Sequence, residues 1–178
     1  PYLAFCNELV TERARAKEIL FEYNNLHPSE MEKRTEILKH FLGATGKQLL
    51  IEQPFRCDYG SNIRVGENFY ANMGCTILDE ALVTFGDNVL LAPNVSIYTA
   101  GHAVNVAQRI VGWEYAYPVT VGHNVWIGGN VVILPGVSIG DNSIIGGGSV
   151  VTKDIPANVI AVGNPCKVIR ELTEDELK

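Results

Sequence analysis

The stretch "VGHNVWIGGNVVILPGVSIGDNSIIGGGSVVTKDI", from Val121 to Ile155, repeats with a period of six residues. The recurring positions are aliphatic: Val121, Ile127, Ile133, Ile139, Ile145 and Val151. Four residues after each of these comes a small or β-branched residue: Val125, Val131, Val137, Ser143, Ser149 and Ile155. Neither the 3.6-residue period of a helix nor the two-residue period of one long strand produces this pattern.

A coil made of three short strands and three turns does produce a six-residue period. The aliphatic residues then point inward, and each coil buries its interior only against the next one, so that several coils must stack. Glycine follows four of the aliphatic residues directly, and we expect it to supply the positive φ of the turns, at Gly122, Gly128, Gly140 and Gly146. The same period continues upstream at Val65, Ala71 and Ile77 and, after a slip of two, at Phe85, Leu91 and Ile97. The sequence therefore predicts a mainly β protein, a parallel β-helix of hexapeptide repeats.

Residues 1–50 carry much charge and little glycine, and they predict a helical segment. The stretch "NELVTERARAKEILFEYNN" has helix-forming residues and an apolar stripe at Leu9, Ala16, Leu20 and Tyr23. "HPSEMEKRTEILKHFLG" predicts a second helix, with Ser29 and Glu32 as a capping box and Gly43 as the C-cap. We divide the chain into this segment, a β-helix over 51–170 and a C-terminal tail over 171–178.

Composition excludes several classes of protein. The net charge of −6 is contrary to the basic surface that nucleic-acid binding needs. No apolar run approaches the roughly 20 residues of a membrane-spanning helix. The four cysteines are far apart and form no CxxC pair, which is typical of reduced thiols in a cytoplasmic protein. The chain begins with Pro1 and not with Met, and we expect the natural chain to begin a few residues earlier.

The repeat is interrupted between Ile97 and Val119. An insertion in a solenoid is typically a loop on its binding face, and we expect a protruding loop at about residues 98–118. The loop is aromatic and carries His102, which is a candidate catalytic base or a solvated loop histidine. The other histidines form no closely spaced ligand pair with it, so we expect no metal site.

Several quoted stretches resemble one family. "NVWIGGNVVILPGVSIGDNSIIGGGSVVTKDIPANVIAVGNPCKVIR" is very similar to the C-terminal half of bacterial maltose and galactoside O-acetyltransferases. "PFRCDYGSNIRVGENFYANMGCTILD" resembles their first coils, and "EYNNLHPSEMEKR" resembles the helical segment of the galactoside enzyme. The resemblance covers essentially the whole chain and implies a left-handed β-helix that assembles as a homotrimer.

The resemblance also implies an activity, the transfer of an acetyl group from acetyl-CoA to a hydroxyl of a sugar such as maltose, glucose or a galactoside. His102 aligns with the catalytic histidine, although Ala103 stands where the family has proline. The acceptor contacts of the family match or neighbour Asp58, Asn72, Asp79 and Glu80, whereas its N-terminal acceptor aspartate falls on Ala4 or Cys6. The residues implied for CoA are Trp126, Gly129, Gly147, Thr152, Lys153, Lys167 and Arg170.

Other hypotheses stay open at this point. The acceptor could be a xenobiotic such as a streptogramin, or the β-helix could be a scaffold without activity. A ping-pong route would need a cysteine thiolate activated by a base, with Cys57 and Cys75 as its candidates. Direct transfer needs only a base for the acceptor hydroxyl, and histidine has a pKa suited to that task.

Overall fold

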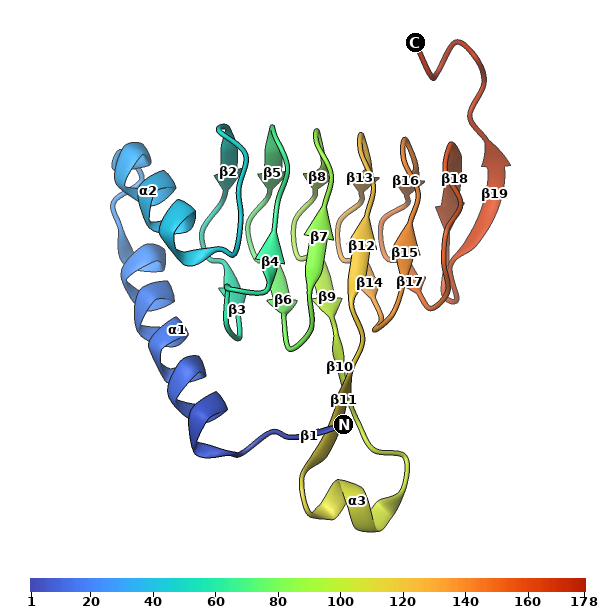
Figure 1. Ribbon diagram of the computed structural model, residues 1–178. Coiled ribbons are helices and arrows are strands. Elements are labelled where there is room, and N and C mark those ends of the chain that lie inside the picture. The colour runs from blue at the N-terminus through green and yellow to red at the C-terminus, as the bar shows by residue number, and fades with distance from the viewer.

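A computed structural model describes residues 1–178 as a stack of coils with two helices on one end and a loop on one side (Figure 1). The strands form three sheets along the stack. The first sheet contains β2 (Leu49–Ile51), β5 (Phe69–Ala71), β8 (Leu90–Leu91), β13 (Trp126–Ile127), β16 (Ile144–Ile145), β18 (Val159–Val162) and β19 (Lys167–Glu171). The second contains β3 (Arg56–Cys57), β6 (Thr76–Leu78), β9 (Ser96–Tyr98), β14 (Val132–Ile133) and β17 (Val150–Val151). The third contains β4 (Ile63–Arg64), β7 (Val83–Phe85), β12 (Val119–Val121) and β15 (Ser138–Ile139).

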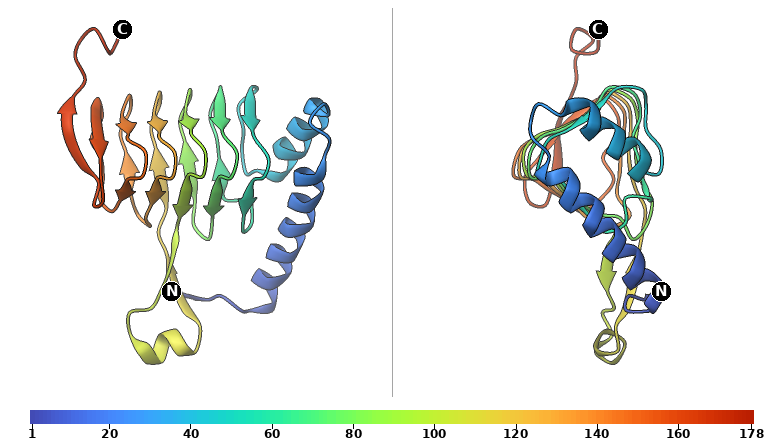
Figure 2. Two further views of the ribbon diagram at one scale, coloured as in Figure 1. Left: turned by 180° about the vertical axis from the view of Figure 1, so that it is seen from behind. Right: turned by 90° about the vertical axis from the view of Figure 1, so that its left-hand side faces the viewer.

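Neighbouring strands within these sheets are parallel, except that β19 runs antiparallel to β18. From β2 to β18, outside the inserted arm, consecutive strands belong to different sheets, so the chain turns at three corners in each coil, as the end-on view in Figure 2 shows. Corner A follows the first sheet at residues 52–55, 72–75, 92–95, 128–131 and 146–149. Corner B follows the second sheet at 58–62, 79–82, 99–118, 134–137 and 152–154. Corner C follows the third sheet at 65–68, 86–89, 122–125, 140–143 and 156–158.

The core lies inside the coils, where the sequence predicts it. The six recurring aliphatics from Val121 to Val151 are at most 2% exposed, and the second series is buried as well. The recurring aliphatics belong to one cluster of 34 buried residues, which also includes Leu20, Tyr23 and Leu38 of the two helices and extends to Cys166. The predicted mainly β fold of stacked parallel coils is confirmed.

The predicted role of the repeat glycines is wrong. Gly122, Gly128, Gly140 and Gly146 do not have positive φ. They are needed because the next coil is too close for a side chain: a Cβ on Gly122 would lie 2.1 Å from Asp141 Oδ1, and one on Gly140 would lie 2.4 Å from the backbone nitrogen of Ala157.

Asparagine supplies the positive φ at corner C instead. Five asparagines stack there with φ between 56° and 62°: Asn68, Asn88, Asn124, Asn142 and Asn158. Each side-chain amide donates to the carbonyl oxygen of the next asparagine, at 2.9 Å for the first three bonds and 2.6 Å for the last. Asparagine tolerates this backbone region better than other residues with a Cβ. The stack therefore serves both the turn and the contact between coils.

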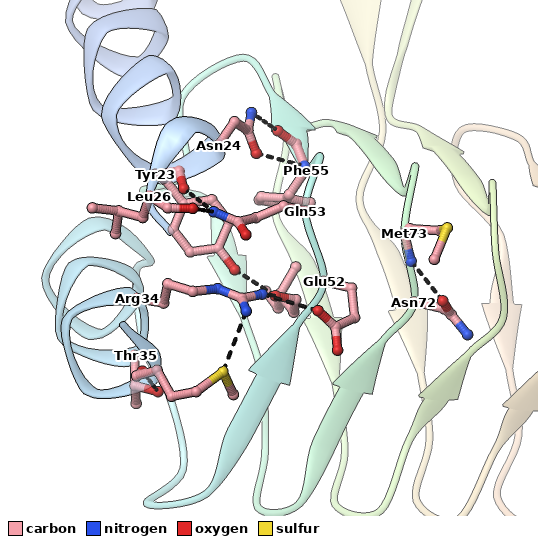
Figure 3. Close-up of polar contacts among 12 residues, drawn as sticks. Tyr23, Asn24, Leu26, Arg34, Thr35, Glu52, Gln53, Phe55, Asn72 and Met73 are labelled. Carbon is pink, nitrogen blue, oxygen red and sulfur yellow. Dashed lines mark hydrogen bonds and ion pairs between the residues drawn. The ribbon is translucent and has the colours of Figure 1, made fainter. Parts of the chain in front are cut away.

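Two helices cover the N-terminal end of the stack, α1 (Asn7–Asn25) and α2 (Met31–Phe41). Ala16, Leu20 and Tyr23 of the predicted stripe are buried. Figure 3 shows the polar contacts that fasten the helices, in which the Tyr23 hydroxyl donates to Ile51 O and Arg34 pairs with Glu52 at 3.0 Å. None of the helices combines the length and the apolar composition of a membrane-spanning segment.

Both predicted caps of the second helix are wrong. Its N-cap is Glu30, which makes no side-chain capping bond, and Ser29 Oγ contacts His27 Nδ1 at 2.8 Å instead. The C-cap is Leu42 in an extended conformation. Gly43 is required for a different reason, because a Cβ there would lie 2.2 Å from Ser61 O.

The insertion at corner B forms a structured arm. It contains β10 (Ala100–His102), α3 (Val106–Ile110) and β11 (Trp113–Ala116). The N-terminal strand β1 (Tyr2–Leu3) pairs antiparallel with β11, which pairs antiparallel with β10. Figure 1 shows the N-terminus beside this arm, between β11 and α3, far along the stack from the end of α1 that meets α2.

The asparagine stack predicts a stability effect. Asn124→Ala should lower the free energy of unfolding by roughly 2–4 kcal/mol. The substitution places alanine in the left-handed backbone region and removes the two side-chain hydrogen bonds that Asn124 makes in the stack. Asn124→Gly removes the same hydrogen bonds but adopts the left-handed backbone without steric cost, so it should lower the free energy of unfolding only about half as much. Urea unfolding monitored by circular dichroism measures both values. Equal losses for the two variants would show that the left-handed backbone at this position does not contribute to the effect.

Candidate active site

His102 lies at the end of β10, on the arm that leaves corner B. The β10–β11 register places it directly opposite Glu114. Its Nδ1 is 3.4 Å from Glu114 Oε1, while 64% of its side chain remains exposed. The carboxylate is mostly covered, with 14% of its side chain exposed. A carboxylate against Nδ1 fixes the orientation of the ring and leaves Nε2 to accept a proton.

Tyr2 holds the other oxygen of this carboxylate. Its hydroxyl donates to Glu114 Oε2 at 2.5 Å, and burial together with the same carboxylate raises the pKa of Tyr2 well above its usual value. The sequence analysis missed both Tyr2 and Glu114. The β10–β11 pairing places Glu114 opposite His102, and the pairing of β1 with β11, across more than a hundred residues, brings Tyr2 to the same carboxylate.

An open hollow of about 410 Å³ lies beside His102. Two aromatic residues of β11 and the following segment, Tyr115 and Tyr117, form part of its wall, and Pro135 of the next coil forms another part. The remaining lining residues are Gly101, Val104, Asn105 and Gln108. The hollow therefore lies between the arm and corner B of the stack, where a substrate can reach the exposed imidazole.

Three of the four predicted acceptor residues lie together at corner B, on the N-terminal side of the arm. Asp79 is fully buried, and its Oδ1 accepts hydrogen bonds from the N–H groups of Asp58 at 3.0 Å and Tyr59 at 2.8 Å. Asp58 and Glu80 are partly exposed beside it. Burial and the neighbouring Asp58 and Asp79 raise the pKa of Glu80 to about 8, and burial also raises the pKa of Asp79.

Two predicted CoA residues lie at the same corner on the other side of the arm. Thr152 and Lys153 are exposed, and they follow Val151, whose carbonyl accepts from Leu134 N at 3.0 Å. This bond places them one coil beyond Pro135 of the hollow. Corner B thus carries predicted acceptor residues before the arm and predicted cofactor residues after it.

The other predicted residues lie elsewhere in the chain. Asn72, Gly129 and Gly147 are at corner A, and Trp126 is half exposed on the first sheet just before that corner. Lys167 and Arg170 are on β19. Arg170 makes a bidentate ion pair with Glu176 of the tail, with both N–O distances at 2.7 Å. The single chain does not bring these residues to His102.

The two cysteines considered for a ping-pong route do not have the character of nucleophiles. Cys57 and Cys75 are buried, and burial raises the pKa of the Cys57 thiol well above its usual range and that of Cys75 to about 11. A thiol with a raised pKa is protonated at neutral pH and reacts poorly. Burial of both candidate thiols therefore disfavours a ping-pong route. No group of three or more His, Cys, Asp or Glu side chains converges as a metal-ligand set.

The two residues onto which the family's N-terminal acceptor aspartate falls, Ala4 and Cys6, have no carboxylate and lie in different surroundings. Ala4 is buried, and its carbonyl oxygen accepts from Arg13 Nη2 at 2.5 Å. The other nitrogen of this guanidinium, Nη1, is 2.5 Å from the Tyr59 hydroxyl. Cys6 is exposed at the start of α1. Arg13 and Tyr59 are further polar residues at this site that the sequence analysis missed.

A parallel β-helix with a histidine on an inserted arm defines the class of hexapeptide-repeat transferases. The model of the maltose acetyltransferase hexapeptide capping motif matches residues 1–46, and that of the bacterial transferase hexapeptide matches residues 118–153. Galactoside O-acetyltransferase of Escherichia coli is 52% identical over 169 residues, which are 95% of this chain and 83% of that protein.

Two solved structures agree with this assignment. A galactoside acetyltransferase in complex with coenzyme A has a TM-score of 0.95 at 50% identity, over 99% of this chain and 88% of that one. A maltose O-acetyltransferase from Clostridium difficile 630 has a TM-score of 0.96 at 54% identity, over 97% and 92% of the two chains. The chain belongs to the maltose and galactoside O-acetyltransferase family.

The pairing of Glu114 with His102 predicts a kinetic effect. Glu114→Gln keeps the shape of the side chain but removes the charge that stabilises a protonated imidazole. We expect kcat for acetyl transfer to fall roughly tenfold to a hundredfold, part of the factor of about 10²–10⁴ that a general base supplies. The KM for acetyl-CoA should stay near its wild-type value. Steady-state assay of CoA release measures both, and Glu8→Gln is the control; an unchanged kcat would exclude this role for Glu114.

Proposed function

We propose that this protein transfers the acetyl group of acetyl-CoA directly to a hydroxyl of a sugar, with His102 as the general base. The observation that carries the proposal is the His102–Glu114 pair facing an open hollow at corner B. A sugar hydroxyl is a weak nucleophile, so the reaction needs a base at the moment of attack. The coenzyme A bound to the similar galactoside acetyltransferase supports the choice of acetyl donor.

The proton moves in a closed cycle. Nε2 of His102 takes the proton of the acceptor hydroxyl while its oxygen attacks the thioester carbonyl. The tetrahedral intermediate then expels the CoA thiolate and leaves the acetyl ester on the sugar. The imidazolium returns its proton to the thiolate, and Glu114 stabilises its charge in the interval.

The oxyanion of the intermediate needs hydrogen-bond donors. We assign this role to the turn at Gly129, whose N–H makes no hydrogen bond to another backbone group. Preorganised backbone N–H groups are the usual donors for such an oxyanion. Gly129 is at corner A, however, whereas His102 is at corner B.

This separation supports a shared site in a homotrimer. Figure 1 shows β13 and the arm at opposite edges of the stack, so Trp126 and His102 of one chain lie apart. We propose that corner B of one subunit faces corner A of the next, which brings Gly129, Gly147 and Trp126 of one copy to His102 of another. The pocket for CoA is then completed by Thr152 and Lys153, with Lys167 and Arg170 near its phosphates.

We place the enzyme in the cytoplasm. All four cysteines are free, with Cys57, Cys75 and Cys166 buried and Cys6 exposed. Unpaired thiols fit the reducing conditions of that compartment.

Replacement of the base tests the reaction. His102→Ala should lower kcat for CoA release in the presence of galactose, maltose or glucose by about a hundredfold or more. Calorimetry should show that the variant still binds acetyl-CoA, because His102 acts on the acceptor. Equal turnover by variant and wild type would refute His102 as the base. Binding of acetyl-CoA without turnover of any sugar would point to a different acceptor, such as a xenobiotic.

Mixed assemblies test the shared site. Gly147→Trp should block CoA at corner A, and alone it should be as inactive as His102→Ala. When the two variants are unfolded, mixed equally and refolded together, about one quarter of the sites should regain an intact histidine and an intact glycine from different chains. Recovery near that fraction of the wild-type rate supports the arrangement. A mixture as inactive as its parents, although trimers form, would place the whole site within one chain.

A further inference from the structure

Three polar side chains stand in one row across the sheet of the arm. The strand register places Glu114 of β11 opposite His102 of β10 on one side and opposite Tyr2 of β1 on the other. Residues directly opposite each other in an antiparallel sheet project from the same face, with their Cβ atoms about 4.5–5.5 Å apart. The row therefore places Tyr2, from the first strand of the chain, one carboxylate away from the histidine.

The carboxylate of Glu114 uses one oxygen for each neighbour. Oε1 lies 3.4 Å from Nδ1 of His102, and Oε2 accepts a hydrogen bond of 2.5 Å from the Tyr2 hydroxyl. The contact with His102 is long, and 64% of the histidine side chain is exposed. The bond from Tyr2 is short and partly buried, so it restrains the direction of the carboxylate more strongly than the imidazole does.

Tyr2 is the only side chain that donates a hydrogen bond to Glu114, and no lysine or arginine pairs with this carboxylate. Burial and the carboxylate raise the pKa of Tyr2 well above its usual value, so the hydroxyl keeps its proton and remains a donor. A neutral donor fixes the orientation of Glu114 without cancelling its charge. A cation in the same place would weaken the stabilisation of a protonated imidazole.

The strand that carries Tyr2 is fastened from two directions. The N–H of Ala4 donates to Gly112 O at 3.4 Å, which extends the pairing of β1 with the arm. The carbonyl oxygen of Ala4 accepts from Arg13 Nη2 at 2.5 Å, and Nη1 of the same guanidinium is 2.5 Å from the Tyr59 hydroxyl at corner B. The strand is thus joined to the arm and, through α1, to the stack, which makes it a rigid support for the Tyr2 hydroxyl.

We propose that Tyr2 is a positioning residue for acetyl transfer, whose hydroxyl holds the Glu114 carboxylate in the orientation that directs the His102 imidazole. The inference rests on the proposed role of His102 as general base, and it deepens that function by adding a third group to the pair. Without the hydroxyl, the Glu114 side chain can turn about its own bonds. The proton of neutral His102 is then no longer confined to Nδ1, and a molecule with the proton on Nε2 cannot accept one from the acceptor.

Steady-state kinetics of CoA release tests this role. Tyr2→Phe removes one oxygen and keeps the ring. It should lower kcat roughly fivefold, within the loss of up to about a hundredfold that misplacement of a catalytic group causes, and should leave the KM for acetyl-CoA unchanged. In a Glu114→Ala background the same substitution should change kcat less than about twofold, because the group through which Tyr2 acts is absent. Thr11→Val, which removes an exposed hydroxyl of α1, should keep the wild-type kcat.

The imidazole itself gives a readout that needs no turnover. Nitrogen NMR of protein labelled at histidine shows which ring nitrogen of neutral His102 carries the proton, and the spectrum of His102→Gln assigns the signals. In the wild type the proton should lie mainly on Nδ1, which faces Glu114. Tyr2→Phe should shift the tautomer ratio toward Nε2, Glu114→Ala should shift it at least as far, and Thr11→Val should leave it unchanged.

The outcomes separate this inference from the proposed function. The inference is wrong if Tyr2→Phe keeps the wild-type kcat, lowers kcat by the same factor with and without Glu114, or leaves the tautomer ratio unchanged. Loss of turnover in His102→Ala would in that case still support the proposed function. If the wild type acetylates no sugar, the proposed function fails, and the tautomer ratio alone then decides whether Tyr2 orients the pair.

Discussion

The close approach of one coil to the next at corner C is the constraint on which the rest of the structure depends. Strands of a sheet lie about 4.7–4.9 Å apart, and every corner must repeat at that spacing. Gly122 and Gly140 allow the approach because a Cβ at either position would collide with the next coil. Asn124 and Asn142 then take a left-handed backbone and bond to each other through their amides. The same turn is thereby imposed on successive coils, and the three sheets stay in register.

The site uses this regularity and departs from it at one place. At corner B the chain leaves the stack after β9 and returns at β12, which pairs with β7 in the regular parallel register of the third sheet. The arm therefore costs the stack no strand pairing. The arm is held in a defined conformation by β1 and β10, which pair with β11 on either side and place Glu114 between Tyr2 and His102. A rigid solenoid thus positions an arm whose histidine would otherwise be a solvated loop residue.

The sequence predicts the coils well because one physical signal repeats in every turn of the chain. A side chain that points inward must be aliphatic, and Ile127 or Ile133 meets that need independently of distant residues. The glycines were misassigned because a close approach between coils and a positive φ both select glycine, and a single sequence does not separate the two causes. The capping box at Ser29 failed because His27 competes for the same hydroxyl.

The site was less predictable for a different reason. The position of His102 follows from the interruption of the repeat, but Glu114 joins it through the β10–β11 pairing within the arm, and Tyr2 joins only through the long-range pairing of β1 with β11. No local pattern marks either residue. The acceptor and CoA residues came from the resemblance to a family, and the structure divides them between two corners in a way that no spacing along the chain reveals.

Charge is arranged along the stack in a way that suits two different substrates. Asp58 and Glu80 lie before the arm, whereas Lys153 lies after it and Lys167 lies on the last strand. Within the β-helix over 51–170, lysine occurs only in this C-terminal part, at Lys153 and Lys167, although the tail beyond Arg170 is again acidic. In the function that we propose, a donor with phosphate groups is favoured at that end and repelled from the carboxyls of the first coils. In the proposed shared site, the acceptor then lies on the side of the arm that carries Asp58 and Glu80, and the donor on the side that carries Lys153, with His102 between them.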